Sequence, residues 1–462
     1  MTTDASTKST SPQSPTGAQQ AATSANDSPF RQWHLVVVVT LTYVVGNIDR
    51  AAINLVVEPI KHDLQISDVQ MSLLLGLAFV VLYSVSIVPA GYIADRVSRR
   101  LLLAGAVVFW SAAAVVSGFA RSYGQLFAAR ASLGLGESAL PPAAYSLLRD
   151  GVAEKNRGRA FSMYQSGITF GNGLGALAGG AIFGLATQGF FSSMPFFGHL
   201  RPWQLVIVLP GLCGILVAAL LLTVREPARA KIPAAGDPAT FGEMFRYLRQ
   251  NASVYAAIFA GVITISLGTS GWSAWIAAAL GRTWGLSPAT IGTTVGTMSL
   301  ILFPLSAFVS GSLMDYIKRR WQNPAAPFWV AVGGCILNLG PAMYVLHAPS
   351  IASMWIAYGL FIFCSTWAVQ AACGYMLATV TPGRLMGKVT SFYYLINNML
   401  GGVFGPMIVA LIAQYGFTGS RGLASAMTIS YSLFVSCAVV VLLIGVRQIH
   451  RWHAKTANVA NA

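Results

Sequence analysis

Residues 91–100 read GYIADRVSRR, and residues 311–320 read GSLMDYIKRR. Glycine, aspartate and the two final arginines recur in the same places, 220 positions apart. The first apolar runs of the two halves, which begin at Trp33 and Ser253, are also 220 positions apart. Another pair, GRAFSMY at 158–164 and GKVTSFY at 387–393, opens the fifth apolar run of each half. Matched segments in one order predict an internal duplication of six apolar runs.

The composition places these runs in a membrane. Of the 462 residues, 55% are hydrophobic and only 9% are charged, whereas a soluble domain carries about 25% charged residues. This balance excludes an ordinary soluble enzyme, a nucleic-acid-binding protein, a disulfide-stapled secreted module and a disordered chain. A spanning helix needs about 20 apolar residues. We therefore predict an all-α integral membrane protein with 12 transmembrane helices in two six-helix bundles.

The predicted organisation has five parts. Residues 1–30, rich in Ser, Thr, Gln, Ala and Pro, form a disordered cytoplasmic tail. The first bundle occupies 31–224 and the second 253–447. Between them, 225–252 form a cytoplasmic linker with a short interfacial helix, because apolar residues there recur at helical spacing beside arginines. Residues 448–462 form a second cytoplasmic tail.

The basic residues predict the orientation. The net charge is +15, with 29 Lys and Arg residues. Of these, 22 fall in the tails and the even-numbered connections, and only five fall in the odd-numbered ones. Cytoplasmic loops carry such an excess of Lys and Arg. Both termini are therefore predicted to be cytoplasmic, in a multi-pass protein of the cell (inner or plasma) membrane, and no nucleic-acid partner is needed to explain the charge.

Three motifs carry a family resemblance. The segment at 91–100 is similar to the signature loop of the major facilitator superfamily, although Ser98 stands where that family usually has glycine. GNIDR at 46–50 and RASLGLGES at 130–138 resemble motifs of the spinster-like transporters and of the anion:cation symporters. The resemblance implies a secondary carrier that works by alternating access, with spans one and four lining a central cavity. Ile48 replaces the usual tyrosine, so no role for that hydroxyl is carried over.

Four charged residues fall well inside predicted spans: Asp49, Arg50, Arg130 and Glu137. Each costs a few kcal/mol at the bilayer centre, so the four must face water or one another. Arg130 and Glu137 are two helical turns apart and share one face. We expect the carboxylates to couple transport to protons and the arginines to hold a substrate head group. The alternative is a permanent Asp49–Arg130 or Arg50–Glu137 ion pair that fastens two helices; buried pairs are weak evidence for stability, which favours coupling.

A second set of charges is predicted to form a cytoplasmic gate. Asp95 and Asp315 end spans two and eight, and in the family such an aspartate faces the start of span eleven or five in the other half. Helix starts carry partial positive charge. The two halves are expected to latch there when the cytoplasmic side is shut, through Asp95, Arg96, Arg157, Arg159, Asp315, Arg384 and Lys388. The alternative is that the basic members only obey the positive-inside bias.

The second half contributes no charge inside its predicted spans. Its cavity candidates are neutral, chiefly Trp272, Trp367, Tyr393 and Asn397. Charged anchors on one side and an aromatic, apolar wall on the other suit a long amphiphile. We therefore expect a lipid-like substrate, of the lysophospholipid or sphingoid phosphate class that spinster-like proteins move. A proton-coupled symporter of small organic anions and a drug-like efflux carrier are the alternatives.

An enzyme is not expected. The sequence has no G-x-S-x-G, H-E-x-x-H or nucleotide-binding G-x-x-x-x-G-K-[ST] motif, and its six histidines all fall in loops, tails or span ends. The five cysteines show no metal-ligand spacing. We predict no cofactor and no metal. The expected partners are the bilayer, protons and the substrate, and the protein is expected to be monomeric.

Overall fold

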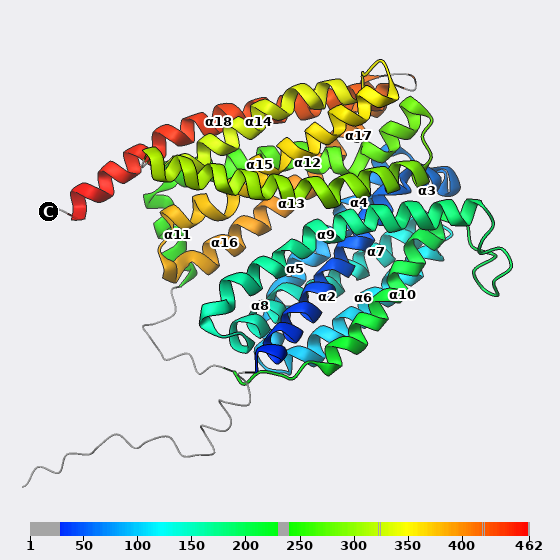
Figure 1. The fold of residues 1–462 in the computed structure, drawn as a ribbon, viewed down its shortest axis with the longest axis horizontal. Helices are drawn as coiled ribbons and strands as arrows, with labels where there is room; N and C mark the ends of the chain where they lie inside the picture. The colour runs from blue at the N-terminus through cyan, green and yellow to red at the C-terminus, as the bar shows by residue number, and fades with distance from the viewer. Residues whose placement is uncertain are drawn as a thin grey trace, which may run out of the picture.

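The computed structural model describes residues 28–229, 240–321, 323, 325–417, 419 and 421–460. These residues form helices without any strand. Two groups of long helices, coloured blue to green and green to red, lie side by side (Figure 1). Most of the predicted amino-terminal tail (1–27) and part of the linker (230–239) lie outside the described residues.

The first bundle contains six spans, two of which are divided. The second span breaks at Gly76 and the fourth at Ser138 and Ala139. A short helix, α3 (Val57–Leu64), follows the first span. The spans, in chain order, are α2 (Pro29–Leu55), α4 (Asp68–Leu75) with α5 (Leu77–Ala94), α6 (Arg99–Gly118), α7 (Tyr123–Glu137) with α8 (Leu140–Gly151), α9 (Glu154–Thr187) and α10 (Pro202–Thr223).

The second bundle repeats this plan. Its fifth span contains a π-helical stretch, η1 (Asn398–Phe404), immediately before Pro406 in the first turn of the next helix. Proline cannot donate a backbone hydrogen bond and clashes with the preceding turn, which accounts for the irregularity. The spans are α12 (Ala252–Trp284), α13 (Pro288–Trp321), α14 (Ala326–Val345), α15 (Ile351–Val380), α16 (Gly383–Asn397) with η1 and α17 (Gly405–Gly416), and α18 (Gly422–Ala460).

The described helices form twelve spans, ten of which hydropathy identifies. Ten helical stretches are long and apolar enough to cross a membrane. The fourth span is not among these ten because its break divides it into two short helices, α7 and α8. The other is α15, in which the apolar stretch Ile351–Ser365 is shorter than a full span. The predicted fold class is confirmed. The helix α18 continues to Ala460, so the described part of the predicted carboxyl-terminal tail extends the last span as one helix.

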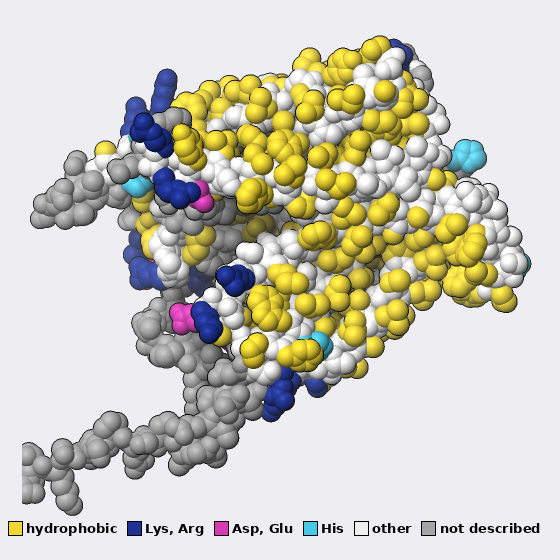
Figure 2. All heavy atoms as spheres, in the orientation of Figure 1, with side chains coloured by type: hydrophobic (Ala, Val, Ile, Leu, Met, Phe, Trp, Pro, Cys, Tyr) yellow, Lys and Arg dark blue, Asp and Glu magenta, His cyan; other side chains and the backbone are white. Residues whose placement is uncertain are grey.

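Charge divides the molecule into two ends. Apolar side chains cover the broad face seen in Figure 2, and Lys and Arg side chains gather mainly at the end where α11 and α16 lie. We call this the basic end, and the opposite one the far end. The carboxyl terminus also lies at the basic end (Figure 1). This distribution is typical of a helical membrane protein with loops of unequal charge.

The linker helix α11 (Phe241–Gln250) packs against the second bundle. Thr240 and Glu243 form a capping box that starts the helix. Met244 is fully buried, and the Tyr247 hydroxyl donates a hydrogen bond to the Val380 carbonyl, 2.9 Å away. Phe241 on the other side is exposed. The helix therefore has one docked face and an exposed apolar side.

Glycines bring the two bundles into backbone contact along α9 and α13. A Cβ atom at Gly296 would lie 2.4 Å from the Leu177 backbone nitrogen, and one at Gly292 would lie 2.5 Å from the Ala176 carbonyl oxygen. Gly171 and Gly175 give α9 the same close approach to α2 within the first bundle. Small residues allow such packing in membranes. The helix α9 therefore connects the first span to the second bundle.

Candidate functional site

The four charged residues predicted at membrane depth meet between α2 and α7. Arg130 Nη1 lies 2.6 Å from Asp49 Oδ2. Arg50 forms the second ion pair, with Glu137. Each pair joins one side chain of α2 to one of α7, and the order of signs is reversed between the pairs. The structure thus brings together both carboxylates and both guanidinium groups.

Two glycines make room for these side chains. A Cβ atom at Gly46 would lie 3.6 Å from the Glu137 carboxyl carbon, so the carboxylate rests directly on α2. Gly134 lies between Arg130 and Glu137 on α7, where a Cβ atom would come within 2.3 Å of the Phe79 carbonyl oxygen. Gly134 therefore allows the backbone of α5 to pack tightly against the charged face of α7.

Only one of the four charges is accessible. The side chains of Glu137, Arg130 and Asp49 are 1%, 2% and 7% exposed, whereas that of Arg50 is 35% exposed. Each of the four also keeps a buried polar atom without a hydrogen-bond partner in the described part of the chain: Asp49 Oδ1, Arg50 Nε, Arg130 Nε and Glu137 Oε1. A pair built only to fasten helices would gain from satisfying these atoms. The four unpartnered atoms therefore leave unused hydrogen-bonding capacity in the cluster.

Aromatic side chains of the first bundle surround Arg50. Its guanidinium carbon lies 4.3 Å from the centre of the Phe79 ring and 5.8 Å from that of Tyr83. Nearby, Tyr43 stacks on Tyr164 with ring centres 4.7 Å apart. The sequence analysis missed this aromatic wall. The spacing of Phe79 and Tyr83, one helical turn apart in the second span, is the signal that could have indicated it.

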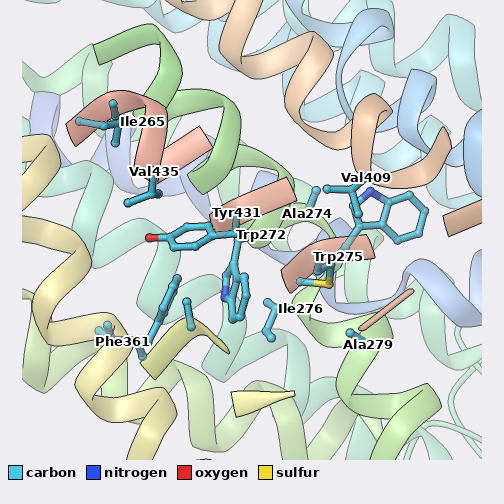
Figure 3. Packing of buried hydrophobic residues seen from close by; sticks show 14 of the residues in the cluster. Ile265, Trp272, Ala274, Trp275, Ile276, Ala279, Phe361, Val409, Tyr431 and Val435 are labelled. Carbon is cyan, nitrogen blue, oxygen red and sulfur yellow. The ribbon is translucent and has the colours of Figure 1, made fainter. Parts of the chain in front are cut away.

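The neutral cavity candidates of the second bundle divide into two groups. Trp272 and Tyr393 are only 3% and 2% exposed and belong to the packed core, so in this conformation they do not form a cavity wall, contrary to expectation. Figure 3 shows Trp272 beside Phe361 and Tyr431, because this face of α12 packs on α15 and α18. Trp367 and Asn397 are only partly buried, and Trp367 Nε1 and Asn397 Oδ1 lack hydrogen-bond partners among the described residues.

The predicted gate residues lie at the basic end without joining the two halves. Arg96 lies over the ring of Tyr92, 3.2 Å from its centre, and Lys388 lies 4.6 Å from the centre of the Phe241 ring. The described residues include no ion pair between any two of the seven, which are Asp95, Arg96, Arg157, Arg159, Asp315, Arg384 and Lys388. The latch therefore stays a prediction for the state in which this end is shut.

Arg99 has a structural role at the same end. It is 1% exposed and pairs with Asp150 and Glu226, joining α6 to α8 and to the segment after α10. Burial tends to raise the pKa of Glu226, which lies outside the spans, but hydrogen bonds from the Arg99 side chain, the Arg100 backbone and the Ser98 side chain bring that pKa below its ordinary value. Arg99 therefore links three segments of the first bundle and does not serve only as a cytoplasmic loop charge.

Ion pairs at the far end join the two bundles. Arg282, in the last turn of α12, donates to Glu58 at 2.6 Å and to Asp68 at 2.7 Å, and both acceptors belong to the first bundle. Lys61 also pairs with Asp68. Among the residues described, the pairs of Arg282 with Glu58 and Asp68 are the ion pairs that cross between the bundles. The sequence analysis did not identify this cluster, because its members fall near span ends and have no matching motif in the other half.

Comparison with known proteins gives the same architecture. The sequence profile of the Major Facilitator Superfamily matches residues 39–406. A human relative, "Protein spinster homolog 1", is 26% identical over 84% of this chain and 74% of its own length. An "MFS-type efflux pump" of Mycolicibacterium smegmatis is 25% identical over 84% and 85%. A crystal structure of a bacterial homolog of the human lysosomal transporter spinster, inward-facing and unoccupied, covers 91% of this chain and 97% of its own, with 24% identity and a TM-score of 0.77.

Proposed function

The chain belongs to the Major Facilitator Superfamily. We propose that it works as a transporter of the spinster type and not as an enzyme. Its substrate is an amphiphilic, lipid-like molecule of the lysophospholipid or sphingoid phosphate class, carried by proton-coupled alternating access. The observation that carries this proposal is the paired charge cluster in which Arg50 alone is partly exposed, beside two aromatic rings.

The cluster suggests how a proton and an anionic head group exchange. Arg50 is held by Glu137 when that carboxyl is ionised. A proton on Glu137 removes the negative charge, so that Arg50 is free to bind a phosphate, for which guanidinium is well suited. The apolar part of the substrate then lies against Phe79 and Tyr83. Asp49 and Arg130 form the adjacent ion pair between α2 and α7. Protonation of Glu137 changes the electrostatic field at this pair and so alters how α2 packs on α7.

The two ends of the molecule support alternating access. The far end is closed by the Arg282 ion pairs, and the predicted latch at the basic end is not formed. We assign the basic end to the cytoplasm of a cell membrane, following the positive-inside rule. The closed cytoplasmic state would pair Asp95 and Asp315 with the basic starts of α16 and α9, near Arg384, Lys388, Arg157 and Arg159. On this assignment the state seen here faces the cytoplasm, and we propose that the carrier acts as a monomer.

Drug-like efflux is the second candidate, because one relative is an efflux pump at similar identity and coverage. A small organic anion fits less well, since a small polyanion favours basic side chains from both bundles. The spans of the second bundle contribute no such charge to the membrane interior.

Uptake into proteoliposomes under an imposed pH gradient tests the proposal. The panel contains a lysophospholipid, a sphingoid phosphate, a hexuronate-type acid and a lipophilic dye. We expect gradient-dependent transport of the first two. Transport of the acid alone would favour the symporter, transport of the dye alone would favour drug efflux, and lipid transport that ignores the gradient would contradict the coupling.

A further inference from the structure

A groove on the first bundle lies outside the charge cluster. It encloses about 550 Å³ between α5, α6 and the junction of α7 with α8. Both α5 and α6 pack against α7 and leave this space over it. The groove runs along α6 from Leu101 to Phe109, eight residues or about 12 Å of helix. Its size is within the range of ligand sites, about 300–1,000 Å³.

The groove is apolar, and it is open on the outside of the bundle. Ile93, Leu101, Phe109 and Leu135 line it, and each is between 43% and 55% exposed. Gly105 lines its floor, and a Cβ atom there would meet nothing within 4 Å. In a spanning helix, side chains exposed at this depth face hydrocarbon. The groove therefore suits a single hydrocarbon chain better than a polar solute.

Basic side chains surround the mouth of the groove at the basic end. Arg96 lies in the turn after α5, three residues beyond Ile93, and is exposed, and Arg100 precedes Leu101. Arg100 Nη1 donates to the Leu222 and Val224 carbonyl oxygens, which hold this side chain at the same end. Arg229 donates to the Ala94 and Val97 carbonyl oxygens on the same loop. The acids Glu226 and Asp150 beside this rim are paired with Arg99 and Arg149. This leaves the positive charges of Arg96, Arg100 and Arg229 beside the negative charge of Asp95, so the mouth favours an anion.

We propose that this groove binds one acyl chain of an anionic membrane phospholipid from the leaflet at the basic end, with its phosphate held by Arg96 and Arg100. Gly136 and Ser138 line the inner end of the groove, on either side of Glu137. The bound chain therefore supports the break between α7 and α8 that positions Glu137. The site is separate from the substrate site, and the inference does not depend on which substrate is carried.

Lipid retention by the purified full-length protein tests the inference. Gly105→Phe places a ring at the groove, where an added Cβ atom meets nothing within 4 Å. Gly333→Phe is the matched control in the third span of the other bundle, where a Cβ atom also meets nothing within 4 Å. Native mass spectrometry in detergent, with added phosphatidylglycerol or phosphatidylcholine, counts the bound lipids. We expect one retained phosphatidylglycerol for the wild type and Gly333→Phe, and at least tenfold weaker retention for Gly105→Phe.

A second variant separates head-group recognition from chain binding and from misfolding. Arg96→Gln/Arg100→Gln leaves the groove intact and should abolish the preference for phosphatidylglycerol over phosphatidylcholine while a lipid chain is still bound. Thermal unfolding of every variant confirms that it is folded. Equal retention by wild type and a folded Gly105→Phe would overturn the groove assignment, and an unchanged lipid preference in the arginine variant would overturn the head-group assignment.

Discussion

Glu137 is the most buried of the four charged side chains, yet its Oε1 atom has no hydrogen-bond partner among the described residues. Its other oxygen pairs with Arg50, which is the exposed member of the cluster. Asp49 has the same arrangement with Arg130. Both carboxylates are therefore held by one partner each, and each can take up a proton without losing a second contact.

Asp49→Asn tests whether this capacity matters. The amide keeps the shape of the side chain and cannot ionise, so we expect normal expression and helix content but uptake that no longer responds to a pH gradient. Arg130→Ala, by contrast, leaves Asp49 charged and unpaired and should destabilise the fold by about 3–5 kcal/mol. Proteoliposome uptake and thermal unfolding measure the two effects. Glu154→Gln, at an exposed helix start, is the control; wild-type pH dependence in Asp49→Asn would refute the role.

Glu226 supplies a stability prediction outside the membrane. Hydrogen bonds hold its pKa below the ordinary 4.5 in the folded protein. Its stabilising effect is therefore fully present above pH 4.5 and is lost as the pH falls through the lower, folded-state pKa. Thermal unfolding followed from pH 6 to pH 3 should show that the wild type loses stability more steeply than Glu226→Gln. Parallel curves for the two proteins would contradict this account of the Arg99 network.

At the residue scale, the site could be predicted because charged residues stand out within apolar spans. Asp49, Arg50, Arg130 and Glu137 could be picked out because no lipid-facing position tolerates them. Which residues pair with which could not be predicted, because the pairing depends on how α2 and α7 are rotated relative to each other. Trp272 was assigned to a cavity wall, but a tryptophan suits a core as well as a cavity, and only the packing of α12 on its neighbours separates the two.

At the scale of elements, glycines recur every fourth residue along the fifth span, at Gly167, Gly171, Gly175 and Gly179. This spacing is typical of close helix packing, and α9 shows such packing. The spacing could not tell which neighbour each glycine meets: Gly171 and Gly175 face α2 in the same bundle, whereas Gly180 faces α13 in the other. The positions of the helix breaks could not be predicted from the sequence either. The fourth span divides at Ser138, beside Glu137, although the sequence there predicts a continuous helix.

Gly296→Leu should separate the two bundles where α9 meets α13. The nearest atoms to an added Cβ are backbone atoms of Leu177 and Gly173, which cannot move aside as a side chain can. The state seen here, closed at the far end, should therefore lose population. Distances between spin labels across the far end should increase. Gly311→Leu, in the same helix with open space around it, should leave them unchanged, and unchanged distances in Gly296→Leu would count against a tight contact.

At the scale of the whole molecule, the far end is held by charges from both bundles. Arg282 contacts Glu58 and Asp68 across the boundary, while the nearby Arg201–Asp63 pair lies within the first bundle. The duplicated motifs predicted the two bundles and their equivalence. They could not predict this closure, because it is asymmetric: the first bundle supplies the acids and the second supplies the base.

Arg282→Gln should open the far end. Loss of both cross-bundle pairs removes the attraction that holds this end shut, so a cysteine placed there should react faster with a membrane-impermeant thiol reagent. Arg201→Gln also removes a far-end ion pair, but not one between bundles, and should leave the rate near that of the parent protein. Equal rates for the two variants would show that the Arg282 pairs do not close the molecule.

The central claim is that protons and substrate exchange at one charge cluster. Its most direct test is proton movement measured with a pH-sensitive dye inside proteoliposomes, after a lysophospholipid is added without any imposed gradient. We predict a substrate-dependent pH change for the wild type and none for Glu137→Gln, although Glu137→Gln still binds the lipid. An equal pH change in both proteins, or no pH change in a wild type that transports the lipid, would contradict the claim.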